Sequence, residues 1–331
     1  MSKRIIAIII ALVLVIGGVV VSTVGLMFDD SLKKSVTDTD GISESVQSGS
    51  DSNNKIVKLS VNGTIQDTGE SDSLFSGGGY DHQAFLKQLD KIKKDSSVKG
   101  VLLEVNSPGG GTYESDEIHK KLEEIKAKDK KVYVQMKNMA ASGGYYISTP
   151  ADKIYAGSQT LTGSLGVIIS SINYSELAND LGVKDESVTS GKHKQILNPM
   201  KDMSKEERNI MQSIIDDSYK QFVDVIKNGR HMSEADVKKL ADGRIYSAQQ
   251  AKANGLIDEI GYEDDAIKDL RNNIKAKNAQ VVTYDTSGNF FNLPLAAKSK
   301  MSAMFGMNDL SKYESLVKAN KSPQPMYLYG E

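Results

Sequence analysis

The sequence predicts an α/β protein with a largely parallel sheet, preceded by one transmembrane helix. Three observations lead to this prediction. Short apolar segments alternate with helix-length segments through the middle of the chain, a pattern typical of parallel βαβ crossovers. The composition, 39% hydrophobic and 25% charged residues, is that of a globular protein. The chain also begins with a long run of uncharged residues.

The uncharged run covers residues 5–28 and predicts a membrane anchor. As a helix, its roughly 24 residues would reach about 36 Å, enough for a hydrocarbon core of about 30 Å. A cleaved signal peptide is the alternative, but its apolar region would be shorter and would end at an A-x-A site. Lys3 and Arg4 precede the run, so residues 1–4 are expected in the cytoplasm and the rest outside. We therefore expect a single-pass protein of the cell membrane.

The segment after the anchor, residues 29–54, is rich in Ser, Asp, Asn and Thr and predicts a flexible stalk. The globular part is expected over residues 55–286. It opens with Val57, Leu59 and Val61 alternating with polar residues, which indicates a strand that ends at an Asn-Gly turn.

Further elements follow from periodicity and length. Helices are predicted at residues 81–94 and 113–127 and from 140 onward, and strands at 101–105, 132–136, 153–156 and 167–172. A capping box of Ser204 and Glu207 opens a long helix, and a short helix follows near Ser233. Residues 287–331 are expected to form an irregular tail. Its Pro-Met-Tyr-Leu-Tyr end is either a strand or a docking segment.

Composition excludes several classes of function. The chain has no cysteine, which excludes disulfides, thiolate nucleophiles and Cys-ligated metal sites. The 41 Lys and Arg residues nearly balance the 43 Asp and Glu residues, giving a net charge of -2. This balance predicts no general attraction to nucleic acid.

One glycine-rich segment, Asn106 to Gly111, lies between a predicted strand and a helix. Its three glycines let the backbone take positive φ and present N–H groups near the start of the helix. Those donors could hold a phosphate or the oxyanion of an acyl-transfer intermediate. A tight strand-to-helix turn is the structural alternative. The segment matches neither a P-loop nor G-x-G-x-x-G.

A second such segment, Met139 to Tyr146, contains Ser142 between two small residues, Ala141 and Gly143. Small neighbours would admit a substrate, and the start of the helix would favour a nearby negative charge. The arrangement is similar to a nucleophile elbow, although G-x-S-x-G itself is absent. Capping the helix is the commoner role for a serine in this position.

A nucleophilic serine needs a base, and the residues alone leave its identity open. Three of the 4 histidines lie in charged or polar stretches where a solvated imidazole is expected: His82, His119 and His231. His193 lies between Lys192 and Lys194, which disfavour its protonated form. A lysine is the alternative base. Its usual pKa of about 10.4 would have to be lowered by burial.

Taken together, these segments resemble the signal peptide peptidase A family of Gram-positive bacteria. The resemblance covers residues 55–270 and the anchor. Its motifs follow one another in the family's order: Val105–Gly111, Met139–Tyr146, Leu161–Val167, Ser190–Lys194, Asp242–Tyr246 and Ala251–Asp258. It implies a Clp protease/crotonase-like fold of repeated ββα units, an oligomeric ring or dome, and a Ser-Lys dyad.

The same resemblance assigns residues to roles. It implies that Ser142 is the nucleophile and Lys194 the general base. The backbone N–H groups of Gly109 and Gly143 fall at the oxyanion hole, and Ser164 falls where a hydroxyl orients the lysine. This chemistry requires no metal or cofactor. Lys194 would take the serine proton and later protonate the leaving amine.

The expected function is therefore a membrane-anchored serine endopeptidase that degrades remnant signal peptides and other apolar peptides. Lys192 occupies a position that is not usually lysine in the family, so it is expected to be dispensable. Two alternatives stay open. A crotonase-like acyl-CoA enzyme shares the glycine-built oxyanion hole, but the anchor would place it away from cytoplasmic CoA thioesters. The other alternative is a non-catalytic membrane scaffold.

Overall fold

The structure is a computed structural model that describes residues 41–68, 80–285 and 326–328. The chain divides into two compact units, and the main unit holds the described residues 46–283 and 326–328. The predicted cytoplasmic end and anchor, residues 1–28, lie outside the described residues. No helix in the described part of the chain is long and apolar enough to cross a membrane.

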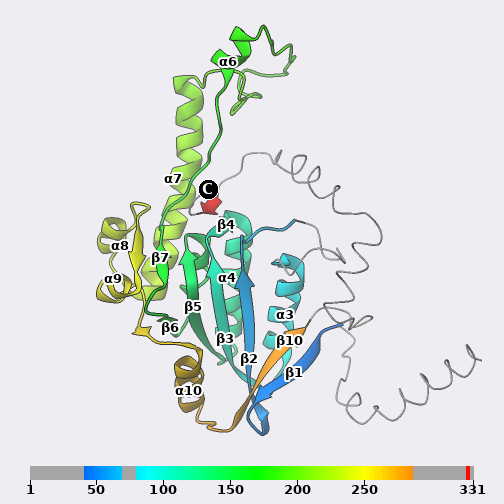
Figure 1. The fold of residues 1–331 in the computed structure, drawn as a ribbon, viewed down its shortest axis with the longest axis vertical. Helices are drawn as coiled ribbons and strands as arrows, with labels where there is room; N and C mark the ends of the chain where they lie inside the picture. The colour runs from blue at the N-terminus through cyan, green and yellow to red at the C-terminus, as the bar shows by residue number, and fades with distance from the viewer. Residues whose placement is uncertain (1–40, 69–79, 286–325, 329–331) are drawn as a thin grey trace, which may run out of the picture. The chain divides into compact units, whose positions relative to one another are not determined.

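The main unit is built on a sheet whose central strands are parallel (Figure 1). Its strands are β1 (Ser43–Ser48), β2 (Asp51–Asn62), β3 (Val98–Ser107), β5 (Lys131–Ala141), β6 (Lys153–Ala156), β7 (Leu161–Gly163), β8 (Ile245–Ser247), β9 (Glu259–Ile260) and β10 (Ala279–Asp285). The order is β1-β10-β2-β3-β5-β6-β9, with β7 pairing β5 and β8 pairing β7. The predicted α/β class with a largely parallel sheet is confirmed.

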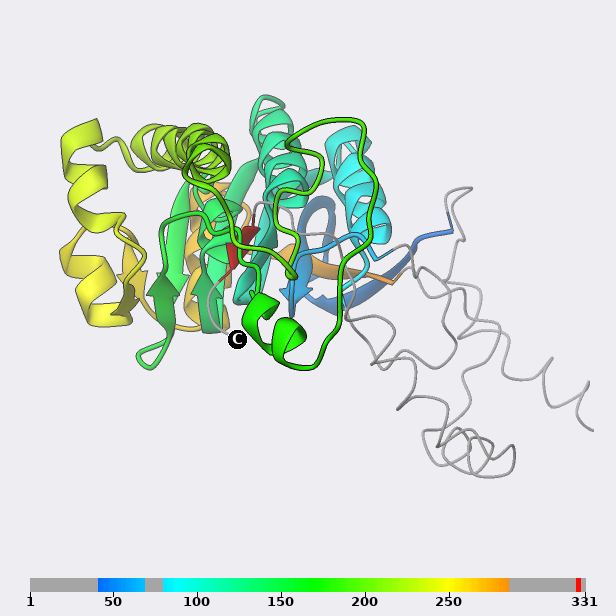
Figure 2. The same cartoon turned by 90° about the horizontal axis from the view of Figure 1, so that it is seen from above.

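The helices of the described residues connect and cover these strands. They are α3 (His82–Lys94), α4 (Thr112–Lys126), α5 (Gly143–Tyr146), α6 (Ser175–Asp180), α7 (Lys205–Arg230), α8 (Glu234–Leu240), α9 (Ala248–Ala253) and α10 (Glu263–Asn273). Figure 2 shows α7, α4 and α3 side by side along one face of the sheet. The Ser204–Glu207 capping box opens α7 as predicted. The predicted helices at 81–94 and 113–127 are also confirmed, to within one residue at each end.

The core explains why β3 is apolar almost throughout. Val101, Leu103 and Val105 are fully buried on one face of this strand. On the other face, Leu102 packs in a cluster with Leu270 of α10. Strands of a parallel sheet that is covered on both faces are buried on both sides and therefore read as continuous apolar runs.

Two predictions about extended and irregular segments need correction. Residues 167–172 do not form a strand; Ile168 makes only an isolated bridge, and Ile172 is 80% exposed. β-Branched residues favour a strand only where a partner edge is available. The sheet also begins inside the predicted stalk (29–54), because Asp51 pairs with Ala279 of β10. The end of the predicted tail, for which a strand and a docking segment were both open, forms a strand, β11 (Met326–Leu328).

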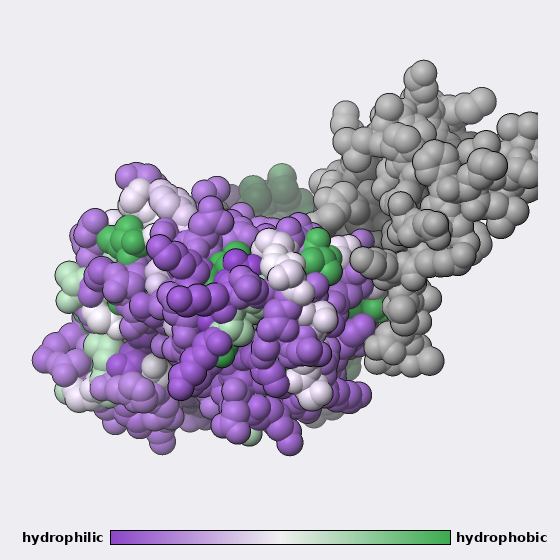
Figure 3. All heavy atoms as spheres, turned by 90° about the horizontal axis from the view of Figure 1, so that it is seen from below, coloured by the Kyte–Doolittle hydropathy of each residue, from purple (hydrophilic) through white to green (hydrophobic). Residues whose placement is uncertain are grey.

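Residues 165–204, here called the arm, lead from β7 to α7 and extend beyond the carboxyl ends of the strands (Figure 1). Several large apolar side chains of the arm are at least half exposed: Ile168, Ile172, Leu177, Leu181 and Val188. In contrast, the face seen from below in Figure 3 is mostly hydrophilic, with isolated hydrophobic residues. Concentrated apolar exposure of this kind marks an interaction surface more often than scattered residues do.

Candidate active site

The site lies where β5 and β7 end and the glycine-rich strand β4 (Gly109–Gly111) begins. Ala141 of β5 pairs in parallel with Gly163 of β7. The residues that follow, Ser142 and Ser164, therefore come directly after paired positions of neighbouring strands, and such strands are spaced about 4.8 Å apart. The two serines singled out in the sequence are thus brought to one edge of the sheet.

Ser142 occupies a strained turn between β5 and α5. Its backbone angles are φ 54° and ψ -116°, a region that costs a non-glycine residue about 1–3 kcal/mol. Its N–H donates to the Gly163 carbonyl at 2.7 Å, and its carbonyl accepts from the Tyr146 N–H at 2.9 Å. These two bonds hold a sharp strand-to-helix turn of the kind that presents a nucleophile.

The side chain of Ser142 is buried and unused. The residue is 1% exposed, and its Oγ has no hydrogen-bond partner among the described residues. It makes no capping bond to α5, so the capping role considered from the sequence is wrong. A buried hydroxyl without a partner costs about 1–3 kcal/mol. Such a group in a native structure calls for a functional reason.

Gly109 lies where three backbone segments meet. Its φ is 108°, and a Cβ added there would lie 1.9 Å from the Tyr327 carbonyl oxygen and 2.7 Å from the Gly143 nitrogen. Only glycine permits this approach. However, the Gly109 N–H donates to the Ser107 hydroxyl at 3.1 Å. It would have to exchange this partner in order to hold an oxyanion.

Both edges of β4 are occupied. On one edge, the Ile65 N–H donates to the Gly109 carbonyl, and the Gly111 N–H donates to the Ile65 carbonyl, both at 2.8 Å. On the other edge, β11 pairs antiparallel, with Tyr327 opposite Gly110. Backbone groups alternate in direction along a strand, so those of Gly110 face β11. β11 also approaches the residue after Ser142, since a Cβ at Gly143 would lie 3.1 Å from the Tyr327 carbonyl oxygen.

The ring of Tyr327 packs in an aromatic cluster with Tyr146 and Phe222, whose own ring centroids are 5.3 Å apart. It stacks on Tyr146 with centroids 4.8 Å apart and contacts Phe222 at 4.6 Å. Its hydroxyl donates to the Ser218 carbonyl at 3.2 Å. Burial raises the pKa of the Tyr327 and Tyr146 hydroxyls. His119 packs edge-on against Tyr146, and burial lowers the pKa of its imidazole.

The histidines do not supply a base to Ser142, whose hydroxyl has no partner in the described chain. The expectation that His82 is solvated is wrong: its side chain is fully buried. Its Nδ1 lies 2.6 Å from the Tyr80 hydroxyl and its Nε2 lies 3.0 Å from a Glu117 carboxylate oxygen. The His82 ring therefore links the start of α3 to Glu117 of α4.

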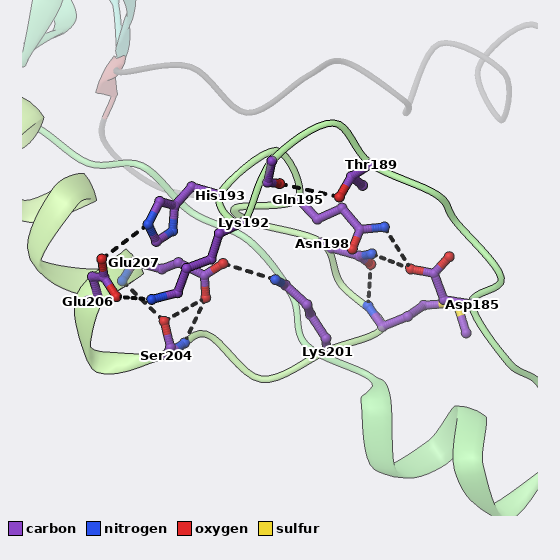
Figure 4. A network of polar contacts seen from close by, with 12 residues as sticks. Asp185, Thr189, Lys192, His193, Gln195, Asn198, Lys201, Ser204, Glu206 and Glu207 are labelled. Atoms are coloured by element: carbon purple, nitrogen blue, oxygen red, sulfur yellow. Dashed lines mark hydrogen bonds and ion pairs between the residues drawn. The ribbon is translucent and has the colours of Figure 1, made fainter.

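Figure 4 shows the surroundings of Lys192 and His193 in the arm. Lys192 forms an ion pair with Glu206, and His193 Nε2 lies 3.2 Å from the same carboxylate. Lys194 is exposed, and its amine has no ion pair or hydrogen bond within the described ranges. Within one copy of the chain, therefore, the Ser142 hydroxyl and the Lys194 amine do not contact each other, and neither has another partner among the described residues.

Sequence reasoning missed three residues that shape the site. Ser107 binds the Gly109 amide, and Ser115 donates to the Gly111 carbonyl at 2.8 Å. Both serines are fully buried, and their positions beside the glycine run were the available signal. For Tyr327 the available signal was the Pro-Met-Tyr-Leu-Tyr segment that contains it, but its place at the site could not be predicted because its partners are far away in the chain. No group of His, Asp or Glu in the described segments is arranged to hold a metal.

Comparison with known proteins identifies the family of the chain. Residues 124–277 match the model of peptidase family S49. A protein of Enterococcus faecium that carries the name signal peptide peptidase SppA is 49% identical over 87% of this chain and 84% of its own length. Protease 4 of Haemophilus influenzae is 38% identical over 65% of this chain, but over 34% of its own length.

Among solved structures, a ClpP1 variant from Listeria monocytogenes covers 64% of this chain and 94% of its own, at 19% identity. The TM-score of 0.42 is too low to support a conclusion about the repeated ββα units. The sequence identity to the Enterococcus protein, over most of both chains, is decisive instead. The chain belongs to peptidase family S49, the family of the signal peptide peptidase SppA, and is a serine peptidase.

Proposed function

We propose that this chain is an endopeptidase that degrades remnant signal peptides and other apolar peptides, with Ser142 as its nucleophile. The observation that carries the proposal is the Ser142 hydroxyl, which is buried without a partner on a strained turn. Gly109 and Gly143 approach each other beside it, and their amides are the proposed oxyanion donors. The name of the Enterococcus relative supports signal peptides as substrates.

The base is Lys194, supplied by a second copy of the chain. Within one copy the Ser142 hydroxyl has no partner in the described residues, while Lys194 is exposed on the arm. Ser164, next to Ser142 by strand register, would orient the incoming amine. Packing the arm against another copy would also remove water from the lysine and so favour its neutral form.

A ring or dome of copies follows naturally from this arrangement. An arm that reaches from one copy to the site of the next makes a head-to-tail contact, and such contacts close into rings. The exposed apolar side chains of the arm, such as Leu177 and Leu181, would be covered by that contact. In this proposal, residues 5–28 anchor each copy and keep the sites outside the cytoplasm. The subunit has the Clp protease/crotonase-like fold of repeated ββα units.

The first test measures cleavage of an apolar signal-like peptide by the intact chain and three variants. Ser142→Ala and Lys194→Ala should lose activity by several orders of magnitude, because each removes one member of the dyad. Lys192→Ala should retain activity and serves as the matched control. Full activity in Ser142→Ala would refute the nucleophile assignment, and a non-catalytic scaffold would then explain the chain better.

The second test mixes the two inactive variants. If each site combines a serine from one copy with a lysine from another, mixed assemblies of Ser142→Ala and Lys194→Ala contain some complete sites. Random mixing in equal amounts should restore about a quarter of the wild-type activity. If subunits exchange and no activity returns, the dyad is formed within one copy and the trans arrangement is wrong.

A further inference from the structure

We infer that Asp185 and Glu206 are positioning residues for the base: they hold the chain on both sides of Lys194, so that its amine points away from the arm. The inference rests on the proposed function, in which Lys194 reaches the site of another copy. Figure 4 shows both carboxylates within one network of polar contacts. Each carboxylate would act on catalysis only through the lysine.

The residues around Lys194 differ in the direction of their side chains. Its two neighbours, His193 and Gln195, are half-buried, whereas Lys194 is exposed. The Nδ1 atom of His193 is buried and has no hydrogen-bond partner among the described residues, so this side of the ring is packed against the arm. Because both neighbours are turned inward, the lysine between them is turned toward solvent.

Glu206 holds the side of the loop that precedes the lysine. His193 Nε2 lies 3.2 Å from a Glu206 carboxylate oxygen, and Glu206 lies in the first turn of α7. The His193 side chain is therefore tied to a long helix. Lys192 pairs with the same carboxylate, but its side chain is 70% exposed. An ion pair so open to water contributes little, which agrees with the expectation that Lys192 is dispensable.

Asp185 holds the side of the loop that follows the lysine. Its Oδ2 accepts from the side-chain amide of Gln195 at 3.2 Å and from that of Asn198 at 2.5 Å. Its Oδ1 accepts from the Ser187 N–H at 2.9 Å. One carboxylate therefore joins the two ends of the loop 185–198, which carries Lys194.

The same loop contains a strained residue three positions after the lysine. Leu197 has φ 67°, a left-handed conformation that is unfavourable for a residue with a Cβ. Such conformations persist where the surrounding contacts impose them, and they gather at functional sites. Here the next residue, Asn198, is bound to Asp185 through its side chain and to the Gln195 carbonyl through its N–H, at 3.0 Å. The path of the chain after Lys194 is therefore specified by these contacts.

A held backbone matters because the target is closed and the lysine is long. Ser142 is 1% exposed, and lysine carries its amine on a flexible four-carbon stem. A loose loop would add to the entropic cost of ordering that stem. A misplacement of about 1 Å can lower a rate about a hundredfold. Loss of Asp185 or Glu206 should therefore lower kcat and change KM little, because the lysine acts in the chemical step.

The first experiment compares four variants of the full chain on the apolar signal-like peptide. Glu206→Ala and Asp185→Ala should each lower kcat about ten- to hundredfold. Glu186→Ala and Asp180→Ala are matched controls, because each removes an exposed acidic residue of the same arm, and both should stay within about twofold of wild type. A kcat of Glu206→Ala or Asp185→Ala equal to that of its control would refute the positioning role of that residue.

Glu206→Gln separates the hydrogen bond from the charge. A carboxylate can only accept, so the His193 ring donates from Nε2, and an amide oxygen at the same place accepts equally. Glu206→Gln should therefore keep kcat within about threefold of wild type. A loss as large as that in Glu206→Ala would show that the ring is not held in the proposed way.

The decisive experiment places the change in one copy at a time. In a mixture of Ser142→Ala and Lys194→Ala, the first chain supplies the lysine of each complete site and the second supplies the serine. Adding Glu206→Ala to the Ser142→Ala chain should lower the activity of the mixture about ten- to hundredfold. Adding it to the Lys194→Ala chain should leave the activity unchanged. Equal losses in both placements would show a general role in folding or assembly and would overturn the inference.

Failure of the proposed function gives different results. If the starting mixture stays inactive although subunits exchange, the trans arrangement is wrong, and the kcat values of the single variants decide the positioning role. Full activity in Lys194→Ala would refute the base and this inference with it. If Ser142→Ala and Lys194→Ala are inactive while Glu206→Ala and Asp185→Ala keep the wild-type kcat, only the positioning role is wrong.

Discussion

Replacing Ser142 by glycine should stabilise the fold while it abolishes activity. The serine holds φ 54° and ψ -116°, angles that glycine adopts without strain and that other residues do not. Ser142→Ala is the natural comparison, because both variants remove the buried hydroxyl that has no partner. The difference between the two isolates the backbone strain from the cost of burying a polar group.

The expected size follows from the structure. Relief of strain contributes about 1–3 kcal/mol in favour of glycine. The greater flexibility of glycine in the unfolded chain costs about 0.5–1 kcal/mol relative to alanine. Ser142→Gly should therefore exceed Ser142→Ala in unfolding free energy by up to about 2.5 kcal/mol, with a central value of about 1 kcal/mol. At an ordinary backbone position the sign should be reversed.

Ser148 supplies that ordinary position. It is buried six residues later, its φ is not positive, and its hydroxyl donates to the Gly144 carbonyl. Urea unfolding of all four variants gives two glycine-minus-alanine differences. We expect a positive value at Ser142 and a value of about -0.5 to -1 kcal/mol at Ser148. The same negative value at both positions would refute the strain argument for the nucleophile turn.

Two further predictions concern the glycine strand and the start of α7. Gly110→Ala should abolish cleavage and lower the urea midpoint, because its Cβ would lie 1.9 Å from the Ile65 carbonyl oxygen. The control Gly191→Ala, whose Cβ would meet open space, should stay within about 0.5 kcal/mol of the wild-type unfolding free energy. Equal urea midpoints for the two variants would contradict the prediction. Hydrogen bonds, first from Lys201, hold the pKa of Glu207 at about 2, below its usual 4.5. Its stabilisation is therefore complete above about pH 4.5 and is lost as the pH falls toward 2, so Glu207→Gln should weaken the fall in urea midpoint between about pH 5 and 3. An unchanged slope would show that the carboxylate does not carry this dependence.

The local elements could be predicted from the sequence because their signals are local. An apolar run such as 101–105 predicts a strand wherever it packs, and the Ser204–Glu207 capping box satisfies the start of its own helix. The glycines around Ser142 and in 109–111 could likewise be singled out, since a close backbone approach demands residues without a Cβ. Such features depend on neighbours a few positions away.

Only the tertiary structure decided which distant segments meet. The pairing of β11 with Gly109–Gly111 joins residues more than two hundred positions apart. Whether residues 167–172 formed a strand depended on whether a sheet edge lay beside them. The family resemblance pairs Ser142 with Lys194, yet within one copy of the chain the Ser142 hydroxyl has no partner among the described residues. Strand pairing and burial are long-range interactions, whose outcome no local pattern records, whereas periodicity, capping and glycine placement are written within a few residues of each site.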